Sequence, residues 1–178
     1  MRRLTSLALS AVSGFSMTAA TSGGTVVAKG KSFLAEVARS DAERARGLMY
    51  RAQFAKDRCM FFVYEEDGLH PIWMKNCLIS LDVAWVAADG TVVEIAENVP
   101  PCSPLRGDDC PTYGGTKPAR HFVEFAAGTF RRLGLKPGDR LGWDLTLDDG
   151  RTFRGGAPVK APAKSSGKVA VGSSRGGR

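Results

Sequence analysis

The hydrophobic positions of the chain fall into short runs separated by polar and turn-forming residues. Each run is rich in β-branched or aromatic residues, as β-strands are. The predicted strands cover residues 33–38, 59–64, 71–76, 81–87, 91–97, 121–126 and 140–147. Asp89 and Gly90, between two of these runs, form a strong hairpin signal. Many short strands with few long helices predict a mostly β, single-domain β-sandwich or partly closed barrel.

Two short helices are predicted beside these strands. Ser40 and Glu43 form a capping box, so one helix should begin after Ser40 and end at Gly47. Residues 127–134 predict the second helix, which ends at Gly134 and is followed by a turn at residues 136–139.

Composition divides the 178 residues into three parts. Residues 1–30 and 151–178 hold three and seven basic residues and no acid, so the net charge of +7 belongs to the ends. The middle carries 15 basic and 18 acidic residues, a net charge of −3, which argues against a nucleic-acid partner. We expect a signal peptide or disordered arm at 1–28, a β domain at 31–155 and a disordered basic tail at 156–178.

The N-terminus has the pattern of an export signal. Arg2 and Arg3 are followed by a short apolar run at residues 4–15 and by small residues at 18–20. This predicts a periplasmic or secreted protein, and the alternative is an uncleaved, disordered arm. The run is too short for a transmembrane anchor. The basic tail is either simply solvated or makes weak contact with anionic lipid or envelope polymer.

Cys102 and Cys110 enclose a loop that has little apolar surface with which to hold itself. In an exported chain such a pair predicts a disulfide, worth about 2.5 kcal/mol in the chain-entropy model. Their spacing matches neither a redox CxxC motif nor a zinc knuckle, so we predict no metal and no cofactor.

Cys59 and Cys77 are a second candidate pair. If residues 59–64 and 71–77 form a hairpin centred on Gly68, Cys59 faces Cys77 at a distance that a disulfide tolerates. The alternative is that both are buried free thiols that pack as small apolar residues.

Polar and aromatic residues that interrupt the apolar runs predict a ligand site. A stacking aromatic, hydrogen-bond donors and an accepting carboxylate in one cleft suit a sugar or another polar ligand. The predicted ligand-binding residues are Trp73, Lys75, Asn76, Asp82 and Tyr113. The structural alternative is that Asp82 forms an ion pair with Lys75 or Arg120, or faces solvent.

Other candidates have weaker support. Arg46 is as well suited to the end of a helix as to an anion. His70 and His121 are not linked by any metal-ligand spacing. Glu124 could join Asp82 as the acid/base pair of a glycosidase, if the two carboxyls were suitably separated in space. None of the common nucleophile, phosphate-binding or zinc-protease motifs is present.

Several segments resemble domain-of-unknown-function family 192 of bacteria and archaea. They are "ARSDAERARGLMYR" (38–51), "MFFVY" (60–64), "IWMKNCLISLDVAWVAADGTVVEI" (72–95), "VPPC" (99–102), "CPTYGG" (110–115) and "LGLKPGDRL" (133–141). The resemblance implies a compact, mostly β domain, often exported, without an established general activity. Cys59 and Cys77 depart from the family pattern, which more often has glycine and threonine there.

Together these features predict an exported accessory domain that binds a polar ligand, such as a carbohydrate, or an envelope partner. One alternative is a hydrolase acting on envelope carbohydrate through Asp82 with Glu124 or Lys75. Another is a purely structural interaction module.

Overall fold

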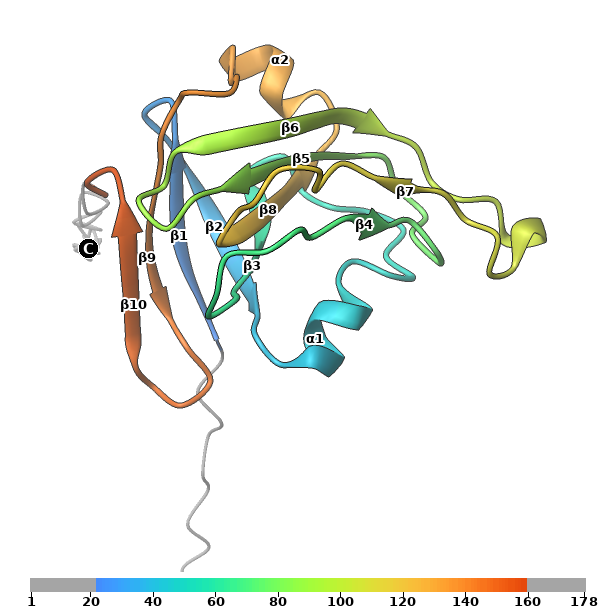
Figure 1. Ribbon diagram of the computed structural model, residues 1–178, viewed down its shortest axis with the longest axis horizontal. Helices are drawn as coiled ribbons and strands as arrows, with labels where there is room; N and C mark the ends of the chain where they lie inside the picture. The colour runs from blue at the N-terminus through green and yellow to red at the C-terminus, as the bar shows by residue number, and fades with distance from the viewer. Residues whose placement is uncertain (1–21, 160–178) are drawn as a thin grey trace, which may run out of the picture.

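The structure is a computed structural model that describes residues 22–159. The predicted export signal, as far as residue 21, and most of the predicted basic tail lie outside the described residues. The fold is mostly β, with two short helices, one curled eight-stranded sheet and one small sheet (Figure 1). The expectation of a partly closed barrel is confirmed.

The large sheet has the strand order β10-β9-β1-β2-β3-β8-β5-β6. All neighbouring strands are antiparallel except β2 and β3, which are parallel. Its strands are β1 (Gly23–Ala28), β2 (Lys31–Ala38), β3 (Arg58–Phe62), β5 (Leu81–Val86), β6 (Val92–Val99), β8 (His121–Ala126), β9 (Leu141–Thr146) and β10 (Thr152–Gly156). Strands β1 and β10 were not predicted. β1 lies in the segment 1–28, which was assigned to a signal peptide or disordered arm, and β10 follows the last predicted strand at the C-terminal end of the predicted β domain.

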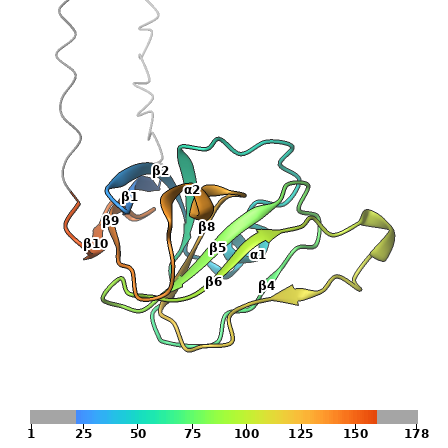
Figure 2. The same ribbon diagram turned by 90° about the horizontal axis from the view of Figure 1, so that it is seen from above.

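The small sheet consists of β4 (Ile72–Trp73) and β7 (Thr112–Tyr113), and it covers part of one face of the large sheet. Between β6 and β7 the chain forms an arm, residues 100–111, that projects from the body in both views (Figures 1 and 2). The arm contains a 3-10 helix (Pro104–Arg106) and the predicted disulfide between Cys102 and Cys110, whose Cα atoms lie 5.8 Å apart.

Both predicted helices are present. Helix α1 (Asp41–Arg46) has the full capping box, in which the Ser40 backbone N–H donates to the Glu43 carboxylate at 2.8 Å. Gly47 ends this helix with a φ of 43°. Helix α2 (Thr129–Leu133) ends at Gly134, whose φ is 63°.

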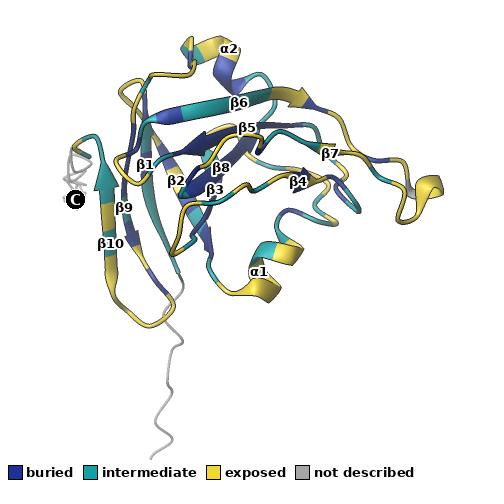
Figure 3. Ribbon diagram, in the orientation of Figure 1, coloured by how far each residue is buried: buried dark blue, intermediate teal, exposed yellow. Residues whose placement is uncertain are grey.

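The sheet has a hydrophobic cluster on each face. Phe61 on β3 and Trp143 on β9 have ring centroids 5.1 Å apart although two strands separate β3 from β9, so the sheet curls around this inner cluster. The outer cluster, which includes Phe62, Trp85 and Phe122, lies on the other face. Strands β5 and β8 are therefore buried on both faces (Figure 3).

The predicted hairpin between residues 59–64 and 71–77 is wrong. β3 lies between β2 and β8, and Gly68, its expected centre, forms a bridge to Ala119 instead. Cys59 consequently belongs to the inner cluster and Cys77 to the outer one. Both are buried free thiols, so the proposed second disulfide is absent and the alternative reading holds.

Candidate functional site

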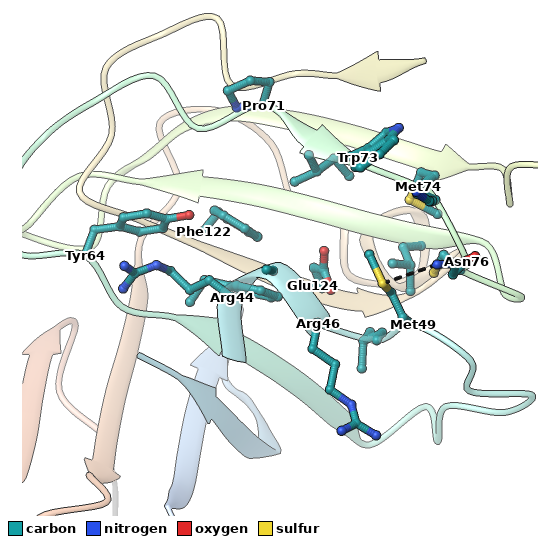
Figure 4. A pocket seen from close by; sticks show the side chains of 18 residues that line it. Arg44, Arg46, Met49, Tyr64, Pro71, Trp73, Met74, Asn76, Phe122 and Glu124 are labelled. Atoms are coloured by element: carbon teal, nitrogen blue, oxygen red, sulfur yellow. Dashed lines mark hydrogen bonds between the residues drawn. The ribbon is translucent and has the colours of Figure 1, made fainter. Parts of the chain in front are cut away.

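A cleft of about 540 Å³ opens on the outer face of the sheet, between α1 and β4 (Figure 4). The turn after α1 forms one wall, β4 and the turn after it form the other, and β3, β5 and β8 form the floor. Among the lining residues are Arg44, Met49, Trp73, Met74, Asn76 and Glu124.

Glu124 lies at the floor of this cleft. Its neighbours in the sheet are Met60 on β3 and Val83 on β5, both in the outer cluster, so its side chain points to the outer face. The residue is only 7% exposed, and its Oε2 atom has no hydrogen-bond partner within the described residues. Burial raises the pKa of this carboxyl to about 8, although the charge of Arg51 opposes the shift. Burial therefore favours the protonated form of Glu124 at neutral pH.

Arg51 does not satisfy Glu124, because its guanidinium is engaged elsewhere. Both of its terminal nitrogens donate to the Glu36 carboxylate, at 2.8 and 2.6 Å. This bidentate pair holds the pKa of Glu36 below its ordinary value. The floor of the cleft thus keeps an acid that has no cation bonded to it.

The end of α1 is built to approach the sheet closely. A Cβ atom on Gly47 would lie 3.3 Å from the Phe62 ring, and the positive φ at this position favours glycine. The chain can therefore turn sharply into Leu48, which is buried, and Met49, which faces the cleft.

Two arginines of α1 border the cleft, and their roles differ. Arg44 donates to the backbone oxygen of Val63 at 2.9 Å, pairs with Asp41 and lies 4.5 Å from the Tyr64 ring centroid. Arg46 is exposed and has no ion-pair partner in the part of the chain that the structure describes. Of these two arginines, Arg46 is therefore the one whose charge is not paired within the described residues.

The opposite wall is braced by the arm. The Trp73 indole N–H donates to the backbone oxygen of Cys110 at 3.0 Å. Lys75 lies over the Trp73 ring, 4.9 Å from its centroid, and pairs with Asp108 of the arm. The disulfide loop thus positions Trp73 and Lys75.

Asn76 stands at the turn after β4, where a φ of 56° takes it out of strand geometry. Its backbone oxygen accepts from the Tyr50 N–H at 2.8 Å, and its side-chain nitrogen lies 3.8 Å from the Met49 sulfur. This turn allows Asn76 and Trp73 to line the same cleft, as predicted.

Tyr113, the fifth predicted ligand-binding residue, lies beside the cleft and does not line it. It pairs with Ile72 in the small sheet, and residues that face each other across antiparallel strands project on the same side. Ile72 is buried in the outer cluster, and Tyr113 packs against that cluster. The structure brings Tyr113 close to the site without making it a lining residue.

Asp82 is not part of this cleft, and its predicted convergence with the other four residues is wrong. It is fully buried, and it accepts the backbone N–H groups of Asn98 and Phe130, both at 2.8 Å. Neither predicted cation pairs with it: Lys75 bonds Asp108, and Arg120 bonds Asp67 at 2.7 Å. Alternation along β5 explains the result, because Asp82 faces the opposite side of the sheet from Val83.

The histidines have structural surroundings. His121 is buried, and its Nδ1 accepts the Tyr64 N–H at 3.2 Å, while burial lowers its pKa to about 3. The His70 ring stacks on Tyr64 with centroids 3.8 Å apart. Within residues 22–159 no group of three or more His, Cys, Asp or Glu side chains could hold a metal ion. No helix in that range is long and apolar enough to cross a membrane.

Sequence reasoning underrated two parts of the site. From the sequence alone, Glu124 was named only as a partner of Asp82. An acid inside the apolar run 121–126 is itself a signal of a buried carboxyl, which must either be paired or take up a proton. Met49 and Met74 were not considered, because a single methionine in an apolar segment has no distinguishing pattern.

An open cleft with a protonated acid at its floor, on the outer face of a half-barrel, is typical of a small-ligand site. The chain belongs to the family DUF192, described as "Uncharacterized ACR", whose model matches residues 24–143. A crystal structure of a protein of unknown function from Novosphingobium aromaticivorans DSM 12444 is similar, with a TM-score of 0.59 and 33% identity over 68% of this chain and 84% of that one. A "putative transcription regulator" from Sinorhizobium meliloti 1021 has a TM-score of 0.57 and 35% identity over 68% and 92%. No curated protein shows significant sequence similarity to the chain.

Proposed function

We propose that this protein is an exported accessory domain that binds a small ligand with polar groups in the cleft between α1 and β4. The observation that carries the proposal is the buried Glu124 carboxyl, whose Oε2 atom has no partner in the described residues. A buried polar atom without a partner is costly, and a ligand that hydrogen-bonds it would remove that cost.

The alternative hydrolase finds less support in this geometry. Asp82 and Glu124 face opposite sides of the sheet, so they cannot flank one scissile bond. Lys75 is held between Asp108 and the Trp73 ring, which leaves Glu124 without a second catalytic group from the predicted set. The interaction-module alternative does not explain why a carboxyl is left unpartnered beneath an open cleft.

Periplasmic or secreted localisation remains part of the proposal. It rests on the export-like N-terminal sequence and on the Cys102–Cys110 disulfide, since such bonds persist mainly in oxidising compartments. The Sinorhizobium meliloti protein is described as a "putative transcription regulator". DNA binding of that kind has no support in the charge of this domain, because residues 31–150 carry a net charge of −3.

A thermal-shift screen tests the proposal. A panel of envelope sugars, muropeptides and small organic acids, amides and amines would be added to the full-length protein. A ligand at 100 times its dissociation constant adds about 2.7 kcal/mol to the free energy of unfolding. Glu124→Leu should abolish the shift, whereas Asp144→Asn, which changes an acid on β9, should retain it. A panel in which no compound shifts the melting temperature would overturn the proposal.

A further inference from the structure

We propose that the cleft selects small organic carboxylates with an apolar body, and that Glu124 donates a hydrogen bond from its own proton to the bound carboxylate. This inference rests on the proposed function, because it names the ligand class of the same site. It follows from three features of the cleft: the sign of the charges at its rim, the chemistry of its floor and the nature of its walls.

The rim of the cleft is positive. Its charged lining residues are Arg44 and Arg46 from α1 and Lys75 from the turn after β4, and Glu124 is the one acidic residue among the described lining. Asp41 and Asp108 each neutralise one of these cations, which leaves the charge of Arg46 in excess. An anion is therefore attracted to the entrance, and an ammonium group is repelled.

The floor offers a hydrogen-bond donor and not a negative charge. Glu124 is flanked by Met60 and Val83, and the remaining titratable groups of the lining are Tyr64, beyond β3, and Cys77. Burial keeps the pKa of the Cys77 thiol above its usual range, and the pKa of Tyr64 is raised as well, so both are neutral. Among the lining residues of this floor the bound anion therefore meets neutral groups, and Arg51, whose charge also acts on Glu124, is paired with Glu36.

A carboxylic acid and a carboxylate make one of the strongest hydrogen bonds available to a neutral side chain. Glu124 in its protonated form supplies the O–H group, and the ligand carboxylate accepts it. If Glu124 lost its proton, two like charges would meet in an apolar surrounding. Binding of an anion therefore requires that the proton stays on the pair.

The walls of the cleft are apolar and adaptable. Met49, Met74 and Phe122 line the cleft (Figure 4), and so does Ile72. Methionine side chains adjust to ligands of different shape, and a cleft of about 540 Å³ lies in the range of small-molecule sites. These walls suit the apolar body of an organic acid better than a fully hydroxylated sugar.

Benzoate, benzamide and benzylamine are probes of equal shape that differ in charge. They would be titrated at pH 6.5 into the full-length protein labelled with ¹³C at its methionine methyl groups. We expect benzoate to shift the resonances of Met49 and Met74, which line the cleft, in proportion to the occupancy of one saturable site. Benzamide should bind at least several-fold more weakly, and benzylamine should leave Met49 and Met74 unmoved.

Substitutions and changes of pH test two contributions to binding separately: the hydrogen bond that Glu124 donates and the positive charge of Arg46. Between pH 6.5 and 9.5 benzoate stays ionised, but its affinity for the wild type should fall about 30-fold as Glu124 loses its proton. Glu124→Gln keeps a neutral donor and should bind benzoate with an affinity that no longer depends on pH. Arg46→Gln should weaken benzoate about 3-fold without affecting benzamide, whereas the matched control Arg131→Gln, on α2, should change neither.

The possible failures are distinguishable. If benzamide or benzylamine moves Met49 and Met74 at lower concentration than benzoate, the carboxylate class is wrong while the cleft remains a binding site. If benzoate binds equally well at pH 6.5 and 9.5, the proposal that Glu124 donates a hydrogen bond from its own proton is wrong. If no probe and no compound of the larger panel binds, the proposed function itself falls.

Discussion

Two buried carboxyls on neighbouring strands have opposite surroundings. Asp82 on β5 pairs in register with Phe125, and the next residue, Val83, pairs with Glu124 on β8. The two acids are thus almost side by side along the sheet, yet they project to different faces. Asp82 accepts two backbone N–H groups, whereas Glu124 has an oxygen without any partner in the described residues.

The difference teaches how to tell a structural acid from a functional one. Asp82 ties β5 to the end of β6 through Asn98 and to the first turn of α2 through Phe130, so its charge is part of the scaffold. Within the described residues the Oε2 atom of Glu124 has no hydrogen-bond partner, and the residue lies at the floor of the cleft. Burial alone does not distinguish the structural acid from the candidate functional one, because both are buried. The presence or absence of hydrogen-bond partners does distinguish them.

The largest effect is expected from removing the structural acid. Asp82→Ala leaves the buried N–H group of Phe130 and the partly buried N–H group of Asn98 without an acceptor, and should lower the free energy of unfolding by about 4 kcal/mol. Urea denaturation at pH 7 measures this loss. If the variant were as stable as the wild type, the assignment of Asp82 to the scaffold would be wrong.

Glu124→Gln should act in the opposite direction. The folded protein holds the Glu124 proton up to a pKa of about 8, whereas the unfolded chain releases it near 4.5. The folded state thus binds more protons between these values, so wild-type stability falls as the pH rises through this window. The variant does not titrate, and its advantage should grow from near zero at pH 4.5 to about 3 kcal/mol at pH 7.

That comparison is made by urea denaturation at pH 4.5, 6 and 7. Asp144→Asn is the matched control, since Asp144 is an accessible acid paired with Arg154. An advantage of Glu124→Gln that stays constant with pH would show that Glu124 ionises normally in the folded state.

Removing the disulfide should test how far the outer face depends on the arm. The free energy of unfolding of the double variant Cys102→Ser, Cys110→Ser should be about 2.5 kcal/mol lower, because the unfolded chain gains conformational entropy without the cross-link. It should also free Trp73, whose indole donates to Cys110, and leave amide exchange at Phe130 unchanged. Hydrogen exchange and tryptophan fluorescence measure these changes. We expect the arm to stabilise the outer face alone, so altered protection of the Phe130 amide, which bonds Asp82 on the other face, would contradict this prediction.

The smallest effect is expected at Lys75. Its partner Asp108 is 82% exposed, so the ion pair is screened by solvent and Lys75→Ala should lower stability by about 0.5 kcal/mol. Removal of the ammonium group from the Trp73 ring should nevertheless change the fluorescence of that indole. Lys75→Arg should preserve both properties, and a loss above about 2 kcal/mol in Lys75→Ala would mean that the arm holds the fold together.

The sequence by itself determined the local features of this protein. The capping box at Ser40, the helix end at Gly47 and the disulfide between Cys102 and Cys110 each depend on residues close together in the chain. The short runs of β-branched and aromatic residues, separated by turn-forming residues, likewise predicted a mostly β domain. Such signals need no knowledge of what the segment packs against.

Only the tertiary structure decided which strands are neighbours and which face each residue meets. The parallel pairing of β2 and β3 separated Cys59 from Cys77, which a hairpin would have joined. The register of β5 against β8 sent Asp82 to one side of the sheet and Glu124 to the other. These pairings are set by contacts distant in the sequence, and a shift of one residue reverses the face of every side chain, so a local pattern could not specify them.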